Sequence, residues 1–286
     1  MARPFATQLF VLISMLIGAC SDHGAGEPLQ DEGQAEVLRL AITTSTRDSG
    51  LIDVLVPPFE DQYEARVMVI AVGTGQAMKL GEQGEVDVVL VHAPEAEHRF
   101  MQAGHGARHE QVMFNTFELV GPADDPAHIR DLPASAALQA IAVSNQRFIS
   151  RGDNSGTNQR ELAMWQSSGG LPTWEGYIES GRGMGATLIM ADQMRAYTLT
   201  DRGTRLAHQN KIDLENLVSA SEELLNTYGA MTVNPTKHGQ INGPLANSFL
   251  DFLISPKIQT LIGQFTVSGQ PLFYPMRQTE LYNEKR

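Results

Sequence analysis

Hydrophobic and polar positions follow a strand–helix rhythm in the first third of the chain. Residues 37–42 (VLRLAI) alternate and then become continuously apolar, which is typical of a buried strand. Residues 51–63 carry apolar side chains at helical spacing, and Pro57-Pro58 within them are expected to start a second turn of helix or to break it. Two further strands are predicted over 66–72 and 87–91, with a short helix over 76–83 between them. This βαβ series predicts a parallel sheet covered by helices.

The remaining pattern predicts a second α/β region after a break. Residues 114–120 form the next expected strand, and the Gly/Pro/Asp-rich run at 121–126 interrupts the pattern. Pro256 stands early in the last expected helix, where proline is tolerated. We expect helices over 157–167, 188–195, 204–210, 245–254 and 255–265, strands over 196–199 and 228–233, and a short segment that ends at 150.

Composition and charge limit the classes of function. The chain has 286 residues and a formal net charge of −12. This length allows two lobes of about 100–150 residues each. An acidic protein is a poor partner for nucleic acid or for an anionic bilayer. An anionic ligand would therefore be held by local donors, against the field of the whole protein.

The N-terminal residues have the pattern of a secretory signal. Arg3 precedes a short apolar run at 9–17, and small residues stand just before Cys20, the one cysteine of the chain. The run is too short to span a bilayer. The pattern resembles a bacterial lipoprotein signal, so we expect 1–19 to be removed and Cys20 to be acylated. The alternative is an ordinary cleaved signal. Residues 20–35, polar and Gly-rich, are expected to be a flexible tether.

Three loops rich in small hydrogen-bond donors follow predicted strands. In open α/β sheets ligands bind at the carboxyl ends of the strands. A helix that begins there points free N–H groups and the positive end of its dipole at the ligand. Each loop alone could serve only to cap a helix, but three together favour an anion site. The loops are 43–46 (TTST), 73–76 (GTGQ) and 150–157 (SRGDNSGT).

Four stretches give the chain a specific resemblance. They are TTSTRDSGLIDVL (43–55), VIAVGTGQAMKLGEQGEVDVVLVH (69–92), SRGDNSGTNQRE (150–161) and AYTLTDRGT (196–204). These stretches are similar to the tungstate-binding proteins of ABC transporters. That family belongs to the class of two-lobed periplasmic binding proteins, which also contains phosphate-binding and molybdate-binding proteins. The similarity runs from about Val37 to Pro275.

The resemblance implies an α/β fold of two lobes, the class II periplasmic-binding-protein fold, with the ligand cleft between the lobes. We expect residues 36–120 and 228–286 to form lobe one, and 121–227 to form lobe two. The chain would cross between the lobes near Gly121 and near Asn226.

Carried over position by position, the resemblance also implies a ligand cage. Thr44 and Ser45 would donate from the first helix start, and Thr74 and Gly75 would donate from the second. Arg151 would supply positive charge. The cage would be closed from the opposite lobe by Ser155, Gly156 and Thr157.

Four neighbouring positions modify this cage. Phosphate binders carry an aspartate, a proton acceptor, where His92 stands here, so we expect phosphate to bind poorly. His92 either contacts the anion or packs beneath the loop. Asp201 and Arg202 would orient Arg151 or cap the following helix, and we expect the first. Ile42 stands where the family usually has threonine, and we expect it to end a strand.

The function expected from the resemblance is the capture of tungstate outside the cytoplasm, by a lipid-anchored protein of the periplasm or cell envelope. The closed form would dock as a monomer on an ABC permease, and a separate ATPase subunit would drive release. We expect no cofactor, no enzymatic activity, no nucleic-acid partner and no resident metal, since the metal enters only within the oxyanion. Alternatives are a molybdate or sulfate binder, a signalling module, or a secreted serine hydrolase that uses Ser155.

Three other motifs carry less weight. The run around Ser155 does not have the spacing of a nucleophile loop. Residues 181–186 (GRGMGA) miss the dinucleotide fingerprint by one position and are interpreted as a loop and helix start near the cleft. His105 and His109 stand at helical spacing without a third ligand, which indicates a solvated helix face.

Overall fold

The computed structural model describes residues 35–219 and 222–278. The contacts divide the chain into Met1–Gln34 and Ala35–Arg286, and the fold described here is that of the second unit. The predicted signal, the acylation of Cys20 and the tether up to residue 34 lie outside the described residues. Among the described helices, none combines the length and the apolar character needed to cross a membrane.

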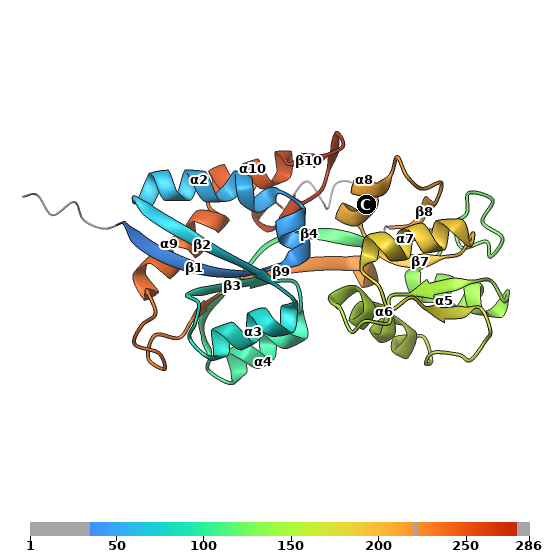
Figure 1. The fold of residues 1–286 in the computed structure, drawn as a ribbon, viewed down its shortest axis with the longest axis horizontal. Coiled ribbons are helices and arrows are strands. Elements are labelled where there is room, and N and C mark those ends of the chain that lie inside the picture. The colour runs from blue at the N-terminus through green and yellow to red at the C-terminus, as the bar shows by residue number, and fades with distance from the viewer. Residues whose placement is uncertain (1–34, 220–221, 279–286) are drawn as a thin grey trace, which may run out of the picture. The chain divides into compact units, whose positions relative to one another are not determined.

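Strands and helices alternate through the described part of the chain, as the pattern predicts (Figure 1). The strands are β1 (Glu36–Thr43), β2 (Ala65–Val72), β3 (Val88–Val91), β4 (Gly106–Gly121), β5 (Phe148–Ser150), β6 (Tyr177–Glu179), β7 (Thr198–Asp201), β8 (Glu215–Val218), β9 (Leu225–Val233), β10 (Thr266–Val267), β11 (Gln270–Pro271) and β12 (Tyr274–Pro275). The helices are α1 (Thr44–Asp48), α2 (Leu51–Tyr63), α3 (Thr74–Glu82), α4 (Pro94–Gln102), α5 (Ala134–Val143), α6 (Gly156–Ser167), α7 (Met184–Gln193), α8 (Arg202–His208), α9 (Gly243–Ile254), α10 (Pro256–Gln264) and the short 3-10 helices η1 (Glu222–Leu224) and η2 (Met276–Gln278).

The main sheet is mixed, which corrects the prediction of a parallel sheet. Its order is β12-β4-β9-β3-β1-β2, and β1 pairs in parallel with β2 and β3, as the βαβ pattern predicts. The late strand β9 then enters the middle of this sheet and runs antiparallel to both β3 and β4. The sheet is mixed because β9, from a distant part of the chain, lies between β3 and β4 and runs antiparallel to both.

Strand β4 is much longer than the predicted strand 114–120. Its first part, from Gly106 to Thr116, pairs with β9, and its last residues pair with β7 and β8. Figure 1 shows β4 and β9 as the long strands that connect the helices on one side with those on the other. His109 is exposed, as the prediction of a solvated face requires, but it lies in β4 and not on a helix, and its Nε2 is 3.0 Å from Glu97 Oε2.

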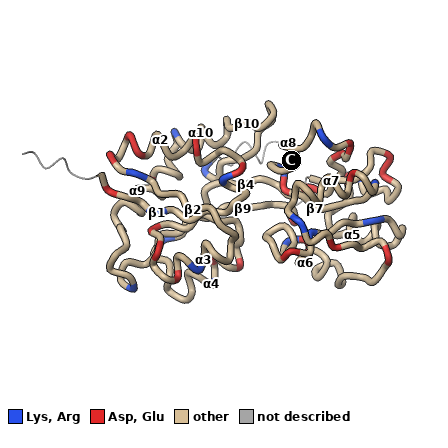
Figure 2. The backbone as a smooth tube through the Cα atoms, viewed as in Figure 1, with Lys and Arg blue, Asp and Glu red and all other residues tan. Residues whose placement is uncertain are grey.

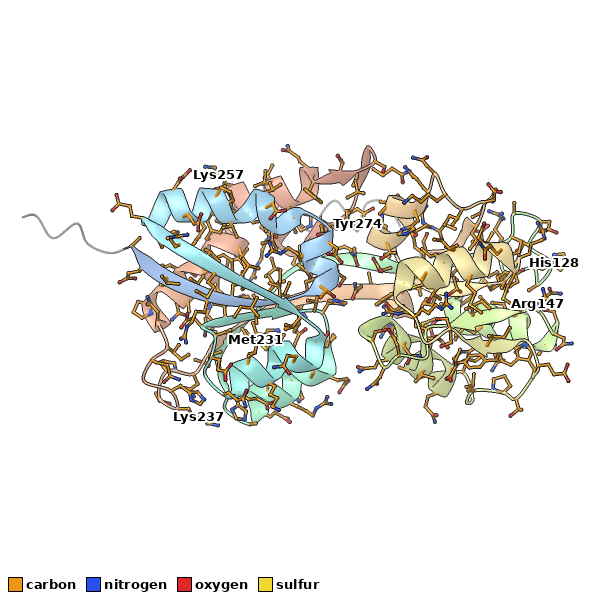
Figure 3. The ribbon with its side chains drawn as sticks, viewed as in Figure 1. His128, Arg147, Met231, Lys237, Lys257 and Tyr274 are labelled. Carbon is orange, nitrogen blue, oxygen red and sulfur yellow. The ribbon has the colours of Figure 1, made fainter. Side chains whose placement is uncertain are left out.

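Two separate groups of buried side chains flank the long strands. The first core packs α2 and α9 against β1, β3 and β9, and Phe59 meets Phe249 edge to face with ring centroids 4.9 Å apart. Fully buried Met231, on the other face of the sheet, belongs to a cluster beside it under α3 and α4 (Figure 3). The second core lies among α5, α6, β4 and β7. The lobe boundaries 36–120, 121–227 and 228–286 stay predictions.

Aromatic rings dominate the second core. Trp165, with 1% of its surface exposed, packs edge to face against Phe148, with ring centroids 6.0 Å apart. Trp174 lies 5.7 Å from Trp165 and 5.4 Å from Tyr177, and its indole N–H donates to the carbonyl of Gln146 at 2.9 Å. Both tryptophans of the sequence therefore belong to one cluster.

Helix α8 is fixed by a buried carboxylate. Glu118 on β4 is fully buried and pairs with Arg202, at 2.9 Å, and with Arg205. The Nε of Arg202 also donates to the carbonyl of Pro271 in β11, at 3.0 Å. Leu206 of the same helix is buried in the first core, although the strand before α8 belongs to the second. These contacts tie α8 to β4 and to the β10–β11 hairpin.

Charged residues of both signs are dispersed over the tube in Figure 2, and acidic ones predominate in the sequence. Several exposed arginines are paired, such as Arg195 with Asp124 and Arg130 with Glu215. Part of the positive charge at the described surface is therefore neutralised locally.

Candidate functional site

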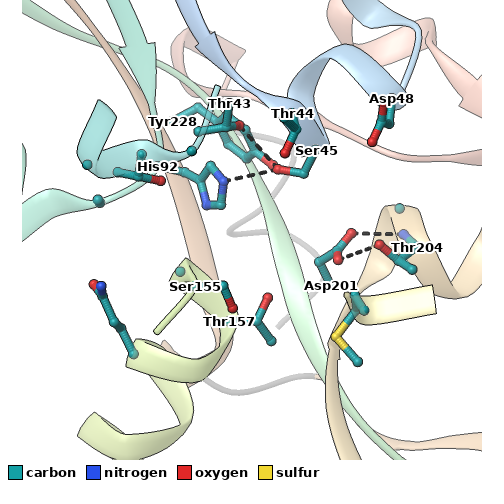
Figure 4. A pocket seen from close by; sticks show the side chains of 18 of the residues that line it. Thr43, Thr44, Ser45, Asp48, His92, Ser155, Thr157, Asp201, Thr204 and Tyr228 are labelled. Atoms are coloured by element: carbon teal, nitrogen blue, oxygen red, sulfur yellow. Dashed lines mark hydrogen bonds between the residues drawn. The ribbon is translucent and has the colours of Figure 1, made fainter. Parts of the chain in front are cut away.

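A cavity of about 1200 Å³ brings the three predicted loops together (Figure 4). It lies where the ends of β1, β2 and β3 face the starts of α6 and α7. Every residue of the expected cage lines it, together with two of the four neighbouring positions, His92 and Asp201. The eight cage residues are Thr44, Ser45, Thr74, Gly75, Arg151, Ser155, Gly156 and Thr157.

The first loop begins the short helix α1 at Thr44. Thr43 ends β1 and caps α1, because its Oγ1 accepts from the backbone N–H of Thr46 at 3.3 Å. The cap leaves the exposed Thr44 and Ser45 at the first turn, where N–H groups have no partner within the helix. Ile42 is fully buried in the first core, so it belongs to the strand, as expected.

The second loop begins helix α3 at Thr74, two residues before the predicted start. Its N-cap residue is Gly73, which provides no side-chain hydrogen bond to the helix. The first N–H groups of α3 are therefore available to a ligand. A Cβ atom added at Gly73 or at Gly75 would meet nothing within 4 Å, so there is free space above this helix start.

The third loop begins helix α6 and is braced from below. Ser155 caps the helix, since its Oγ accepts from the N–H of Asn158 at 3.4 Å. Beneath the loop, Ser150 Oγ donates to the buried carboxylate of Glu161 at 2.6 Å and accepts from the Asn158 side chain at 3.2 Å. Burial raises the pKa of Glu161, although the hydrogen bond from Ser150 acts in the opposite direction. This network holds the start of α6 in place.

Arg151 brings the positive charge of the third loop to the cavity. Its side chain is 17% exposed and pairs with Asp153. Its Nε is buried and has no hydrogen-bond partner among the described residues. An unsatisfied buried donor costs about 1–3 kcal/mol. The ion pair with Asp153 therefore leaves one guanidinium donor, the Nε–H, unsatisfied in a residue that lines the cavity.

His92 packs beneath the first loop and also lines the cavity, and its contact with an anion stays a prediction. Its ring stacks on Tyr228 with centroids 4.7 Å apart, and its Nδ1 lies 2.9 Å from Asn226 Oδ1. Its Nε2 lies 3.3 Å from Ser45 Oγ. A Cβ atom added at Gly156 would lie 3.5 Å from the ring, so the start of α6 faces His92 directly.

The chain is similar to known proteins over most of its length. Residues 30–257 match the family model described as the PBP superfamily domain. The tungstate-binding protein TupA of Peptoclostridium acidaminophilum is 43% identical over 275 residues, which cover 94% of this chain and 96% of the relative. The chain belongs to the TupA family within the PBP superfamily.

Two solved structures support this assignment. TupA of Desulfovibrio alaskensis superposes with a TM-score of 0.80 at 40% identity and covers 84% of this chain and 99% of its own. The tungstate ABC transporter protein of Geobacter sulfurreducens gives a TM-score of 0.72 at 46% identity, with 81% and 100% covered. The TupA family match confirms both the resemblance found in the sequence and the two-lobed periplasmic-binding-protein fold.

Asp201 differs from its predicted role in this TupA-family site. Its carboxylate caps α8, accepting from Thr204 N at 2.8 Å and from Thr204 Oγ1 at 2.6 Å (Figure 4). Arg202 turns away to Glu118, and the described ion pair of Arg151 is with Asp153. The expectation that Asp201 and Arg202 orient Arg151 is therefore wrong, and the capping alternative describes the contacts of Asp201.

Asp201→Asn tests what this carboxylate does in the cavity. Asparagine caps helices about as well as aspartate, so the thermal stability is expected to stay unchanged. Loss of a negative charge from the cavity wall is expected to raise oxyanion affinity about two- to tenfold. Titration calorimetry and a melting curve measure the two effects. A weaker-binding Asp201→Asn variant would show that the carboxylate supports the ligand.

The cavity lining also includes a loop that the sequence places near the cleft and two residues that the sequence does not identify. The start of α7 contributes Gly183, whose cap position lacks a side-chain hydrogen bond, as in α3. This places the 181–186 loop at the cleft, as interpreted. Tyr228 and Asn115 come from β9 and β4. Their only sequence signal is a polar side chain within an otherwise apolar strand.

The contacts of Ser155 give no support to a hydrolase. Its Oγ caps α6, and its backbone N–H donates to Asp153 at 3.1 Å. The hydrogen bonds of the described histidines include none to this hydroxyl, whereas a serine nucleophile needs an adjacent base. Among the described residues, no group of three or more His, Cys, Asp or Glu side chains is arranged to hold a metal ion.

Proposed function

We propose that this protein binds tungstate in the cavity and delivers it, outside the cytoplasm, to an ABC-type permease. The observation that carries the proposal is the convergence of the starts of α3 and α6 with Arg151 on one cavity. The names of the relatives support tungstate as the ligand and an ABC transporter as the destination.

The donors around the cavity suit a fully deprotonated tetrahedral anion. Helix starts offer N–H groups and a positive dipole end, and Thr44, Ser45 and Thr157 add hydroxyls. Hydrogen bonds to an ionised acceptor are roughly twice as strong as neutral ones. Such local donors are needed because the protein itself carries a net charge of −12.

We infer that the sides of the cavity approach each other when the anion binds. Its volume of about 1200 Å³ exceeds the range of about 300–1,000 Å³ that encloses drug-sized ligands, which are far larger than one oxyanion. Thr44, Ser45 and Gly75 are exposed in this state. We infer that the anion shifts the protein toward a closed form, in which donors from both sides reach it and water is excluded. The permease would bind that closed form.

The residues around His92 predict discrimination against phosphate. A hydrogen phosphate needs an acceptor for its proton, and tungstate, molybdate and sulfate do not. Asp201, one carboxylate of the wall, already accepts two hydrogen bonds from Thr204. Tungstate and molybdate have nearly the same size, so the choice between them depends on small differences in donor placement.

Calorimetric titration of the purified, signal-processed protein with tungstate, molybdate, sulfate and phosphate tests the proposal. We expect one-to-one binding of tungstate, weaker binding of sulfate, and phosphate weaker than tungstate by at least about a hundredfold, since unpaired polar groups cost several kcal/mol. Bound tungstate should also raise the melting temperature by mass action. If none of the four anions binds, the oxyanion proposal is wrong, and ester hydrolysis through Ser155 becomes the next assay.

A further inference from the structure

A chain of hydrogen bonds runs from the first loop of the cavity through His92 to the long strands. Thr46 Oγ1 lies 2.7 Å from Thr43 Oγ1, which lies 3.1 Å from Ser45 Oγ. The chain continues through His92, which lies between Ser45 and Asn226. It ends where Asn226 on β9 donates to its cross-strand partner on β4, Asn115 Oδ1, at 2.8 Å.

The direction of these hydrogen bonds follows from their ends. Asn226 uses its amide nitrogen for Asn115, so its oxygen faces His92 Nδ1. The Nδ1 must therefore carry the ring proton, and the Nε2 of a neutral ring is left as an acceptor. Ser45 Oγ is then the donor in its 3.3 Å hydrogen bond to His92 Nε2.

The consequence concerns the hydroxyl of Ser45, which points into the cavity (Figure 4). A serine hydroxyl has one proton, and in this arrangement His92 receives it. Thr43 is then the donor to Ser45 Oγ. What Ser45 presents to the cavity is an oxygen lone pair, which repels a dianion. With the hydrogen bond to His92 in place, Ser45 Oγ contributes no donor to the predicted cage.

We propose that His92 is a positioning residue that takes up one proton when a dianion binds beside Ser45, and so turns the Ser45 hydroxyl toward the ligand. This rests on the proposed oxyanion-binding function. The proton comes from solvent and stays on Nε2. The new Nε2–H donates to Ser45 Oγ, which frees the Ser45 proton to donate to an oxygen of the anion. No covalent bond of the anion changes.

The surroundings of His92 keep the ring neutral until the anion arrives. Burial lowers the pKa of His92, although the hydrogen bond to Asn226 and the charges of Asp201 and Glu97 act in the opposite direction. Tyr228 stacks on the ring from β9. The start of α6 faces the ring with the uncharged Gly156 and the positive end of its dipole.

A bound dianion reverses this balance. It would lie between the start of α6 and His92, where its two negative charges favour an imidazolium. The pKa of His92 is then higher in the loaded protein than in the empty one. Affinity therefore rises as the pH falls through the loaded-state pKa, and it stays constant at higher pH, where the ring is neutral in both states. One proton gives a slope of up to about tenfold per pH unit.

Calorimetry of tungstate binding in buffers that differ in ionisation enthalpy tests this directly, because the enthalpy then reports the protons exchanged. Between about pH 6 and about pH 8, we expect an uptake that approaches one proton toward the acidic end, with tighter binding there. His92→Gln offers Ser45 an amide donor that does not titrate. This variant is expected to bind tungstate with no proton uptake and with an affinity independent of pH.

His128→Gln is the matched control. His128 lies in the turn region between β4 and α5, away from the cavity lining, and its replacement is expected to leave the uptake as in the unchanged protein (Figure 3). Tight tungstate binding without proton uptake in the unchanged protein overturns this inference and leaves the proposed function intact. Uptake that persists in a folded His92→Gln protein also overturns it. Absence of tungstate binding overturns both.

Discussion

Replacing Arg151 by alanine is expected to lower the affinity for the oxyanion by about 2–5 kcal/mol, which is roughly thirtyfold to several-thousandfold. The guanidinium is the positive charge of the third loop, and its Nε is buried without a partner among the described residues. The substitution also leaves Asp153 without its ion-pair partner in the wall of the cavity. A negative charge beside the site adds to the loss.

Titration calorimetry with tungstate measures this effect, and two variants bracket it. Arg151→Lys keeps the charge but not the planar fork of donors, so an intermediate loss is expected. Arg195→Ala removes an exposed arginine that pairs with Asp124 outside the cavity lining, and it should leave the affinity unchanged. If the Arg151→Ala variant binds tungstate as tightly as the unchanged protein, Arg151 is not part of the ligand cage.

Replacing Glu118 by alanine is expected to destabilise the fold by about 3–5 kcal/mol, because it leaves buried cations without their partner. Glu118 is fully buried, and its two arginines are only 16% and 13% exposed. The loss should be read as a lower midpoint of unfolding in urea with an unchanged slope.

Glu215→Ala provides the comparison for the stability measurement. Its ion pair with Arg130 lies at the surface, with both side chains about half exposed, and such pairs contribute about 0–1 kcal/mol. Glu118→Gln keeps the shape of the side chain and some of its hydrogen bonds. Its loss of folding stability should therefore lie between those of Glu118→Ala and Glu215→Ala. A Glu118→Ala protein as stable as Glu215→Ala would show that Arg202 and Arg205 find other partners.

The elements that the sequence predicts well are those with one clearly buried face. Helix α2 begins and ends where its apolar spacing predicts, since Leu51, Leu55 and Phe59 all enter the first core. Strands β1 and β3 are recognised because their apolar runs are buried on both faces. In these elements the burial pattern can be read within a few neighbouring residues.

The missed elements lack such a contrast. Helix α5 (ASAALQAIAV) is apolar nearly all round, so no polar face marks a helical period. Helix α4 (PEAEHRFMQ) buries the charged Glu97 beside Phe100. The first half of β4 is polar, and it is a strand because β9 pairs with it from more than a hundred residues away. Pairing at that distance leaves no local signal.

The residues of the site show the same difference between local signals, which the sequence reveals, and distant contacts, which it does not. Each cage loop carries its own Gly- and Thr-rich signal, and the structure places all three in one cavity. The hydrogen bond between His92 and Asn226 joins residues 134 positions apart, so the sequence could not predict it. For Asp201, a local signal was present: an aspartate three residues before a threonine, at a helix start, is a common cap.

The aromatic cluster of the second core gives the protein an intrinsic fluorescence signal for unfolding. Trp165 and Trp174 are the two indoles of the sequence, and both lie in that cluster. Their emission therefore reports the packing of the second core alone, whereas far-ultraviolet circular dichroism reports the helices around both cores. Coincident unfolding curves from the two signals would show one cooperative unit. An early change in emission would show that the indole-bearing half melts first.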